Sequence, residues 1–133
     1  MAAQFPAQSP NQTGLAPAPR LPIDMLHLAK QALGDPGLEL EVLRLFDEVV
    51  RVNVLRLEQA TSVPDVQRHL HTIRGASVGV GAWGLAQHAH IMEVELRDGA
   101  EVNAEHIQDI RMSTEEVRAF IAERIAAAPD YAD

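Results

Sequence analysis

Residues 103–125, NAEHIQDIRMSTEEVRAFIAERI, decide the fold of this chain of 133 residues. Apolar side chains recur in this segment at alternating spacings of three and four residues, which is the pattern of a helix packed in a bundle. Asn103 precedes the repeat and is a suitable N-cap, because its side-chain oxygen can accept hydrogen bonds from free backbone N–H groups. The segment is therefore predicted to be a bundle helix. Its buried stripe is expected at Ile107, Ile110, Thr114, Val117, Ile121 and Arg124 or Ile125.

Upstream of this segment the sequence predicts four more helices, each bounded by capping or breaking residues. Gly34 ends the first helix, whose apolar spacing starts at Leu21. Asp35 caps the second helix, and the Ser-x-x-Asp box at residues 62–65 begins the third. The expected ranges are roughly 21–33, 38–60, 63–80 and 82–97. With no strand pattern anywhere, the fold class is predicted as all-α: an antiparallel four-helix bundle with a short preceding helix.

The first twenty residues differ from the rest of the chain in composition. Residues 1–20 hold four of the eight prolines together with Gln, Ser, Asn and Gly, and they show no apolar periodicity. Such a segment buries too little apolar surface to offset the entropy of ordering. The predicted organisation is therefore a disordered N-terminal arm over residues 1–20 and one helical domain over residues 21–128.

The composition also excludes several function classes. The chain has no cysteine, which excludes disulfides, thiolate metal sites and a cysteine nucleophile. The net charge of −8 argues against a nucleic-acid partner, which requires a basic surface. The sequence shows neither a secretory signal nor an apolar run of the ~18 residues that a membrane span needs. A cytoplasmic protein without membrane insertion is expected.

The chemistry of the chain depends on its histidines. A metal site needs ligands that converge, but His69 and His71 are two residues apart and point to different sides of a helix, as do His88 and His90. No His-Glu-x-x-His pattern occurs. The sequence therefore predicts no metal site.

His71 differs from the other histidines in its surroundings. Two arginines and a mid-helix glycine share its helical face, and arginine can hold a phosphoryl group through charge-assisted hydrogen bonds. Glycine destabilises a helix by about 1 kcal/mol relative to alanine, so its presence suggests a close approach to the backbone. The approaching group is either a partner protein or a neighbouring helix, and the second alternative would turn His71 inward. The residues that share the face of His71 are Gln67, Arg68, Arg74, Gly75 and Val78.

The segment His71-Thr72-Ile73-Arg74-Gly75, followed by small residues to Gly81-Ala82 and then Leu85, resembles the histidine-phosphotransfer (HPt) family, whose motif is H-x-L-K-G. The resemblance covers about residues 38–127, and its specific motif lies within residues 71–93. The stretch that includes the fourth predicted helix resembles in particular the amino-terminal phosphotransfer domain of chemotaxis kinases. There a second histidine and a glutamate follow the phosphorylated histidine by 19 and 22 residues, the positions of His90 and Glu93 here.

This resemblance implies a phosphohistidine carrier. His71 would be the phosphoacceptor, Glu93 would orient and activate it, and Arg74 would stabilise the phosphoryl group. His90 would orient Glu93. The family usually has lysine at the position of Arg74. The compact ammonium charge of lysine is therefore replaced here by the planar guanidinium of arginine, which has several N–H donors.

The resemblance also implies partners and excludes an intrinsic kinase activity. A sensor or hybrid histidine kinase and a response-regulator receiver domain would bind the face formed by Gln67, Arg68, Gly75 and Val78. The receiver would supply Mg²⁺, so the chain needs no cofactor of its own. The chain lacks an ATP-binding motif and is expected to be a monomer. Two alternatives stay open: a helical adaptor that relays nothing, and a metal- or haem-binding bundle that uses His71, His90 and Glu93.

Overall fold

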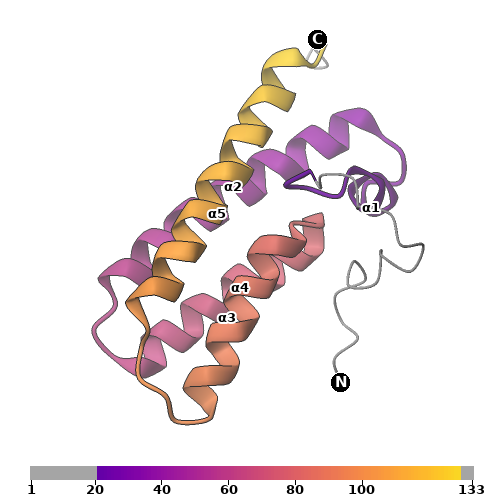
Figure 1. Ribbon diagram of the computed structural model, residues 1–133. Helices are drawn as coiled ribbons and strands as arrows, with labels where there is room; N and C mark the ends of the chain where they lie inside the picture. Colours follow the sequence, from indigo (N-terminus) through magenta and orange to yellow (C-terminus); the bar gives the residue numbers. More distant parts are fainter. Residues whose placement is uncertain (1–20, 130–133) are drawn as a thin grey trace, which may run out of the picture.

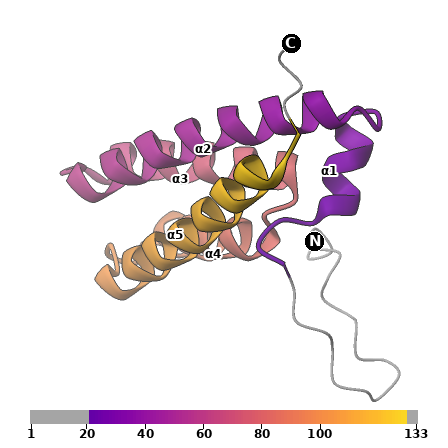
Figure 2. The same ribbon diagram turned by 90° about the horizontal axis from the view of Figure 1, so that it is seen from above.

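The computed structural model describes residues 21–129, which form five helices and no strand. Helices α2 to α5 form an antiparallel bundle, and α1 crosses one end of it (Figures 1 and 2). The predicted all-α bundle with a short preceding helix is confirmed, whereas the expected disordered arm lies outside the described residues. None of the helices in this part of the chain is long and apolar enough to cross a membrane. The helices are α1 (Met25–Gln31), α2 (Pro36–Gln59), α3 (Val63–Val80), α4 (Trp83–Arg97) and α5 (Ala104–Ala127).

The predicted caps set the start of three of the long helices. The Asp35 side chain accepts hydrogen bonds from two backbone N–H groups at 2.9 and 3.3 Å. Ser62 accepts from the Asp65 N–H at 3.3 Å, and Asn103 caps α5 in the same manner. Helix α2 begins at Pro36, directly after its predicted cap and two residues before the range expected from apolar spacing, because proline suits the first helical turn.

The core is aliphatic and continuous through the bundle. In α5 the predicted stripe is buried at its four central positions, while Ile107 and Ile125 are half-buried and Arg124 is exposed. Burial of these side chains supplies the main favourable free energy of folding. The largest fully buried residues are Ile23, Leu28, Leu43, Leu57, Leu70, Ile73, Leu85, Met92, Ile110 and Ile121.

Helix α1 begins later than the sequence predicts. Asp24 is its N-cap and accepts a hydrogen bond from the His27 N–H at 3.1 Å. Leu21 therefore lies before the helix, and it is 60% exposed. The prediction that Leu21 starts the apolar stripe of the first helix is wrong, because the capping aspartate fixes a later start.

Asp24 also fastens α1 to the turn between α3 and α4. Its carboxylate accepts a hydrogen bond from the Trp83 indole N–H at 2.9 Å, and its backbone N–H donates to the Gly81 carbonyl at 2.9 Å. Nearby, His27 Nε2 lies 3.1 Å from the Val78 carbonyl. Gly81 has a φ of 81°, and a Cβ at this position would lie 2.9 Å from the Asp24 Cβ. Both the conformation and the space therefore require glycine.

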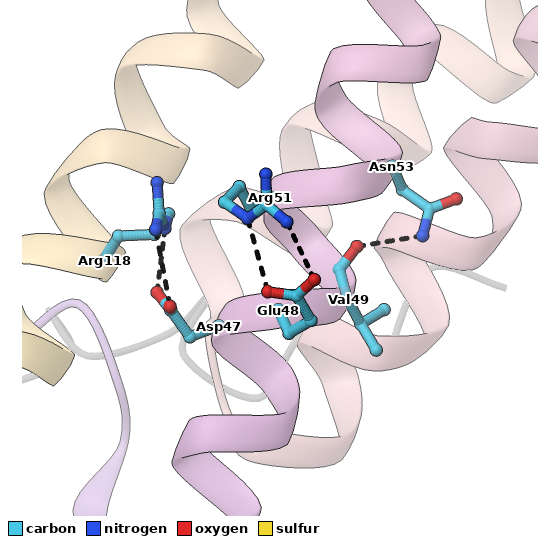
Figure 3. A network of polar contacts seen from close by, with 6 residues as sticks. All are labelled: Asp47, Glu48, Val49, Arg51, Asn53 and Arg118. Carbon is cyan, nitrogen blue, oxygen red and sulfur yellow. Dashed lines mark hydrogen bonds and ion pairs between the residues drawn. The ribbon is translucent and has the colours of Figure 1, made fainter.

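Ion pairs line the junction of α2 and α5. Arg118 of α5 donates to Asp47 of α2 at 2.8 Å, while Arg51 and Glu48 pair within α2 at the same distance (Figure 3). These side chains are partly exposed, and exposed pairs contribute between zero and about 1 kcal/mol each. The packing of the apolar core, rather than these pairs, therefore holds α5 against α2.

The attachment of α1 is testable through Trp83→Phe. The hydrogen bond from Trp83 is the main cause that lowers the pKa of Asp24 below its ordinary value of 3.8. A lowered carboxyl pKa contributes stability above pH 3.8, and this contribution is lost as the pH falls through the lowered value. We expect Trp83→Phe to reduce the free energy of unfolding by about 1–2 kcal/mol at neutral pH. The Asp24 pKa should rise, and the amides of α1 should exchange faster. An NMR titration that gives the same Asp24 pKa in both proteins would contradict the role assigned to Trp83.

Candidate functional site

His71, Arg74 and Glu93 meet where α3 packs against α4. His71 and Arg74 are three residues apart on α3 and therefore share a helical face. Glu93 comes from α4, which returns antiparallel to α3 after a tight turn at Gly81. Its carboxylate is only 17% exposed, whereas the side chain of His71 is 71% exposed. The structure thus places an exposed imidazole over a carboxylate that is mostly shielded from water.

The Nδ1 atom of His71 faces both charged neighbours. It lies 3.4 Å from Oε2 of Glu93 and 3.2 Å from Nη2 of Arg74. The Nε atom of Arg74 forms an ion pair with the other carboxylate oxygen of Glu93. Nε2 is on the other side of the ring from Nδ1, which leaves it on the side away from this ion pair.

His71 is the most accessible histidine of the chain. All six histidines lie within the described residues, and the other five are half-buried. His69, two residues away, turns toward α2, where its Nδ1 lies 3.2 Å from the Asn53 side-chain oxygen. A reaction with a second protein requires an accessible nucleophile, so the structure favours His71.

Gly75 lies one turn after His71 and is exposed to solvent. A Cβ placed on Gly75 would meet no atom within 4 Å. Of the two explanations for this glycine, the packing of a neighbouring helix is therefore excluded. Val78, a further turn along, is 37% exposed. Together His71, Gly75 and Val78 form a helical face that is open to a partner.

The comparisons with known proteins agree with this geometry. The family described as Hpt domain matches residues 41–123, which is more than half of the chain and includes the whole site. The chain belongs to the Hpt domain family. No match is found among curated proteins or among solved structures. Membership of the family implies histidine phosphotransfer in a two-component phosphorelay, in which an Hpt domain carries the phosphoryl group without being a kinase.

The other predicted residues of this Hpt domain lie near His71 to different degrees. Gln67 is half-buried one turn before it on α3. Arg68 is exposed and forms an ion pair with Asp65 at 2.7 Å, and this pairing is the main cause that lowers the pKa of Asp65. The charge of Arg68 is thus already shared with a carboxylate. His90 is half-buried one turn before Glu93 on α4, and its predicted role in orienting Glu93 stays a prediction.

The metal-binding alternative requires several ligands in one place. Among residues 21–129, no group of three or more histidine or acidic side chains is arranged to hold a metal ion. This finding includes the proposed set of His71, His90 and Glu93. The geometry therefore favours the Hpt interpretation over a metal site in this part of the chain.

The residues beside Val78, at the far end of the open face, are not predicted from the sequence. His27 of α1 reaches the backbone carbonyl of Val78, and Trp83 packs edge-on against the His27 ring with a centroid distance of 4.9 Å. These contacts join positions that are 51 or more residues apart. No spacing rule within one helix connects such positions, although Trp83 is the single tryptophan of the chain.

Gly75→Gln tests whether the open space at this position serves a partner. Glutamine favours a helix more than glycine does, and nothing packs against position 75, so we expect stability to be equal or up to ~1 kcal/mol higher. Phosphotransfer should fall, because the longer side chain occupies the face beside His71. Thermal melts and a transfer assay measure the two effects.

Gly84→Gln on α4 is the matched control, since Gly84 is also exposed and a Cβ placed on it would meet no atom within 4 Å. Gly84 is nine residues before Glu93, which places it on the opposite side of α4 from the site. The control variant should change stability in the same way and leave transfer nearly intact. Equal transfer by Gly75→Gln and the unchanged protein would show that no partner approaches position 75.

Proposed function

We propose that His71 carries the phosphoryl group of a phosphorelay on Nε2, between a sensor or hybrid histidine kinase and a receiver-domain aspartate. The observation that carries this proposal is the exposed ring of His71 with its Nδ1 side against Glu93, inside the segment that matches the Hpt family. A neutral imidazole has a lone pair on one ring nitrogen, and this lone pair can act as a nucleophile. The open face beside the ring leaves space for the acidic pocket of a partner.

The transfer step needs a lone pair on Nε2. This lone pair attacks the phosphorus of the aspartyl phosphate, the N–P bond forms, and the O–P bond to the aspartate breaks to leave a free carboxylate. The ring then carries a formal positive charge with its proton on Nδ1. Transfer in the opposite direction reverses the same bonds.

Glu93 assists this step by accepting a hydrogen bond from Nδ1–H. That contact selects the tautomer with the lone pair on Nε2 and stabilises the positive ring as the N–P bond forms. The low exposure of Glu93 strengthens the interaction, because less water screens it. Arg74 adds a positive charge near the developing phosphoryl oxygens, although its Nε is engaged by Glu93.

The receiver partner supplies the acidic pocket and the Mg²⁺ for the transfer step. A receiver active site is acidic and binds the Mg²⁺ that neutralises the phosphoryl oxygens, while this chain has a net charge of −8. Two acidic proteins do not attract one another over long range, so local contacts around His71 must select the partner. We propose a cytoplasmic monomer that meets its partners in this manner.

His71→Gln tests the identity of the carrier. The variant should take up no phosphoryl group from a cognate kinase or phosphorylated receiver, with unchanged helical content, because the His71 side chain is 71% exposed. Acid-labile phosphate per mole of protein is the measurement. His69→Gln is the matched control and should label fully.

Stoichiometric labelling of His71→Gln would place the phosphoryl group on another histidine. An absence of labelling in the unchanged protein, with any cognate donor, would instead favour the adaptor without a relay function.

Glu93→Gln tests the assistance of the carboxylate. We expect phosphorylation of His71 to slow by about 10²-fold, which is the lower end for a residue that assists proton transfer. The matched control is Glu95→Gln, because Glu95 lies two residues away on α4 and pairs with His106 at 2.8 Å, on the side toward α5. Single-turnover labelling rates for the two variants give the comparison. Equal rates would show that Glu93 does not act on His71.

A further inference from the structure

Helices α3 and α4 carry three arginines, and two of them are engaged by carboxylates. Arg68 pairs with Asp65 at 2.7 Å, and Nε of Arg74 pairs with Glu93. The third, Arg97, lies in the last turn of α4 and is exposed. In the described part of the chain it has no ion pair. Its guanidinium is therefore available to another molecule.

The carboxylates of these two helices, in contrast, all have basic neighbours. They are Asp65, Glu93 and Glu95. The first two are bound by arginines, and Glu95 contacts His106 of α5 at 2.8 Å. Among the arginines and carboxylates of α3 and α4, Arg97 alone lacks an ion pair with a described residue. A chain with a net charge of −8 thus presents an unpaired positive charge on the helix that supplies part of the site.

Arg97 lies beside the His71 site and is displaced along α4. It follows Glu93 by four residues, so the two share a face of α4 and are about 6 Å apart along the helix axis. Because α4 runs antiparallel to α3 (Figure 1), this displacement points toward the level of Gln67, one turn before His71. Arg97 is therefore at the end of the surface that is farther from Val78.

The two ends of the surface around His71 differ in chemistry. Toward the turn, Gly75 leaves open space and Val78 presents an apolar side chain that is 37% exposed. At the other end the exposed guanidinium of Arg97 lies at the level of the half-buried Gln67. A partner with an acidic part and an apolar part is accommodated best in one orientation, with its acidic part over Arg97.

We propose that Arg97 is a specificity-determining residue, which pairs with the acidic rim of a receiver pocket. This proposal rests on the proposed function of His71. A receiver pocket is acidic because Mg²⁺ is held by carboxylates. An ion pair with Arg97 favours the encounter and sets its orientation, in which apolar receiver side chains lie over Gly75 and Val78. Arg97 acts on association and not on the N–P bond.

The other two arginines are less suited to this contact. Arg68 and Arg74 would each have to leave a carboxylate of their own chain before pairing with a receiver. That exchange replaces one ion pair by another and gains little free energy. Arg97 gives up no ion pair with a described residue, so its charge is the one that a receiver gains in full.

The test is the transfer rate of Arg97→Glu with a receiver domain that already transfers a phosphoryl group to the unchanged protein. At low salt and limiting receiver concentration, we expect the rate to fall by about fivefold, the upper end for one exposed ion pair. At saturating receiver concentration the maximum rate should be unchanged, because rim charges act on association. In 1 M salt, where the screening length is about 3 Å, the difference should disappear.

Arg124→Glu is the matched control. Arg124 is also an exposed arginine in the last turn of a helix, so the variant changes the net charge equally. Its guanidinium lies 6.0 Å from the ring centroid of Phe120, and it lines a pocket with Leu40 between α2 and α5, away from the α3–α4 site. Arg124→Glu should transfer at the unchanged rate. Circular dichroism checks that both variants keep their helical content.

Three results would overturn the proposal: an unchanged rate for Arg97→Glu, a fall confined to its maximum rate, or an equal fall in Arg124→Glu, which would indicate an effect of net charge alone. Each of them differs from a failure of the proposed function, because His71 would still take up the phosphoryl group in the unchanged protein and in both variants.

Discussion

The turn between α3 and α4 fixes the register of the two helices that form the site. Gly81 ends α3 in a left-handed conformation, and Ala82 is the N-cap of α4. His71 precedes Gly81 by 10 residues, and Glu93 follows Ala82 by 11. At 1.5 Å per residue these intervals correspond to about 15 and about 17 Å along antiparallel helices, so the two side chains come level. The spacing of 22 residues between them is thus a consequence of one tight turn.

Helix α1 supports this turn from outside the bundle. Asp24 bonds to the Gly81 carbonyl and to the Trp83 indole, one contact on each side of the turn. The absence of a side chain at Gly81 allows this close approach. A segment that supplies no residue to the His71 site therefore helps to keep His71 and Glu93 in register.

Local rules predict most of the fold, and the motif predicts the site. The caps at Asp35, Ser62 and Asn103 and the central stripe of α5 follow from spacing and side-chain chemistry within a few residues. The contact between His71 and Glu93 is expected from the resemblance to the family. A spacing of 22 residues does not by itself predict a contact, because the register of the two helices depends on the turn between them. The family match supports that resemblance.

Contacts between distant segments are not predicted, for physical reasons. The docking of α1 depends on a hydrogen bond between Asp24 and Trp83, which are 59 residues apart. No pattern in the sequence around either residue predicts this contact. The ion pair between Arg74 and Glu93 depends on the distance between two helices and on the rotamers of both side chains. Apolar spacing at Leu21 places the start of the first helix too early, because it takes no account of the capping potential of Asp24.

The exposure of the His71 ring also bears on how long a phosphoryl group can be stored. A group carried on Nε2 would project from a side chain that is 71% exposed, with an open glycine beside it. Water would reach the phosphorus as readily as a partner does, because no lid covers the ring within residues 21–129. The lifetime of the stored group would then depend on the intrinsic hydrolysis rate of the N–P bond rather than on shielding by the protein. A carrier of this kind transmits a signal faithfully only when partner encounters are frequent compared with that hydrolysis.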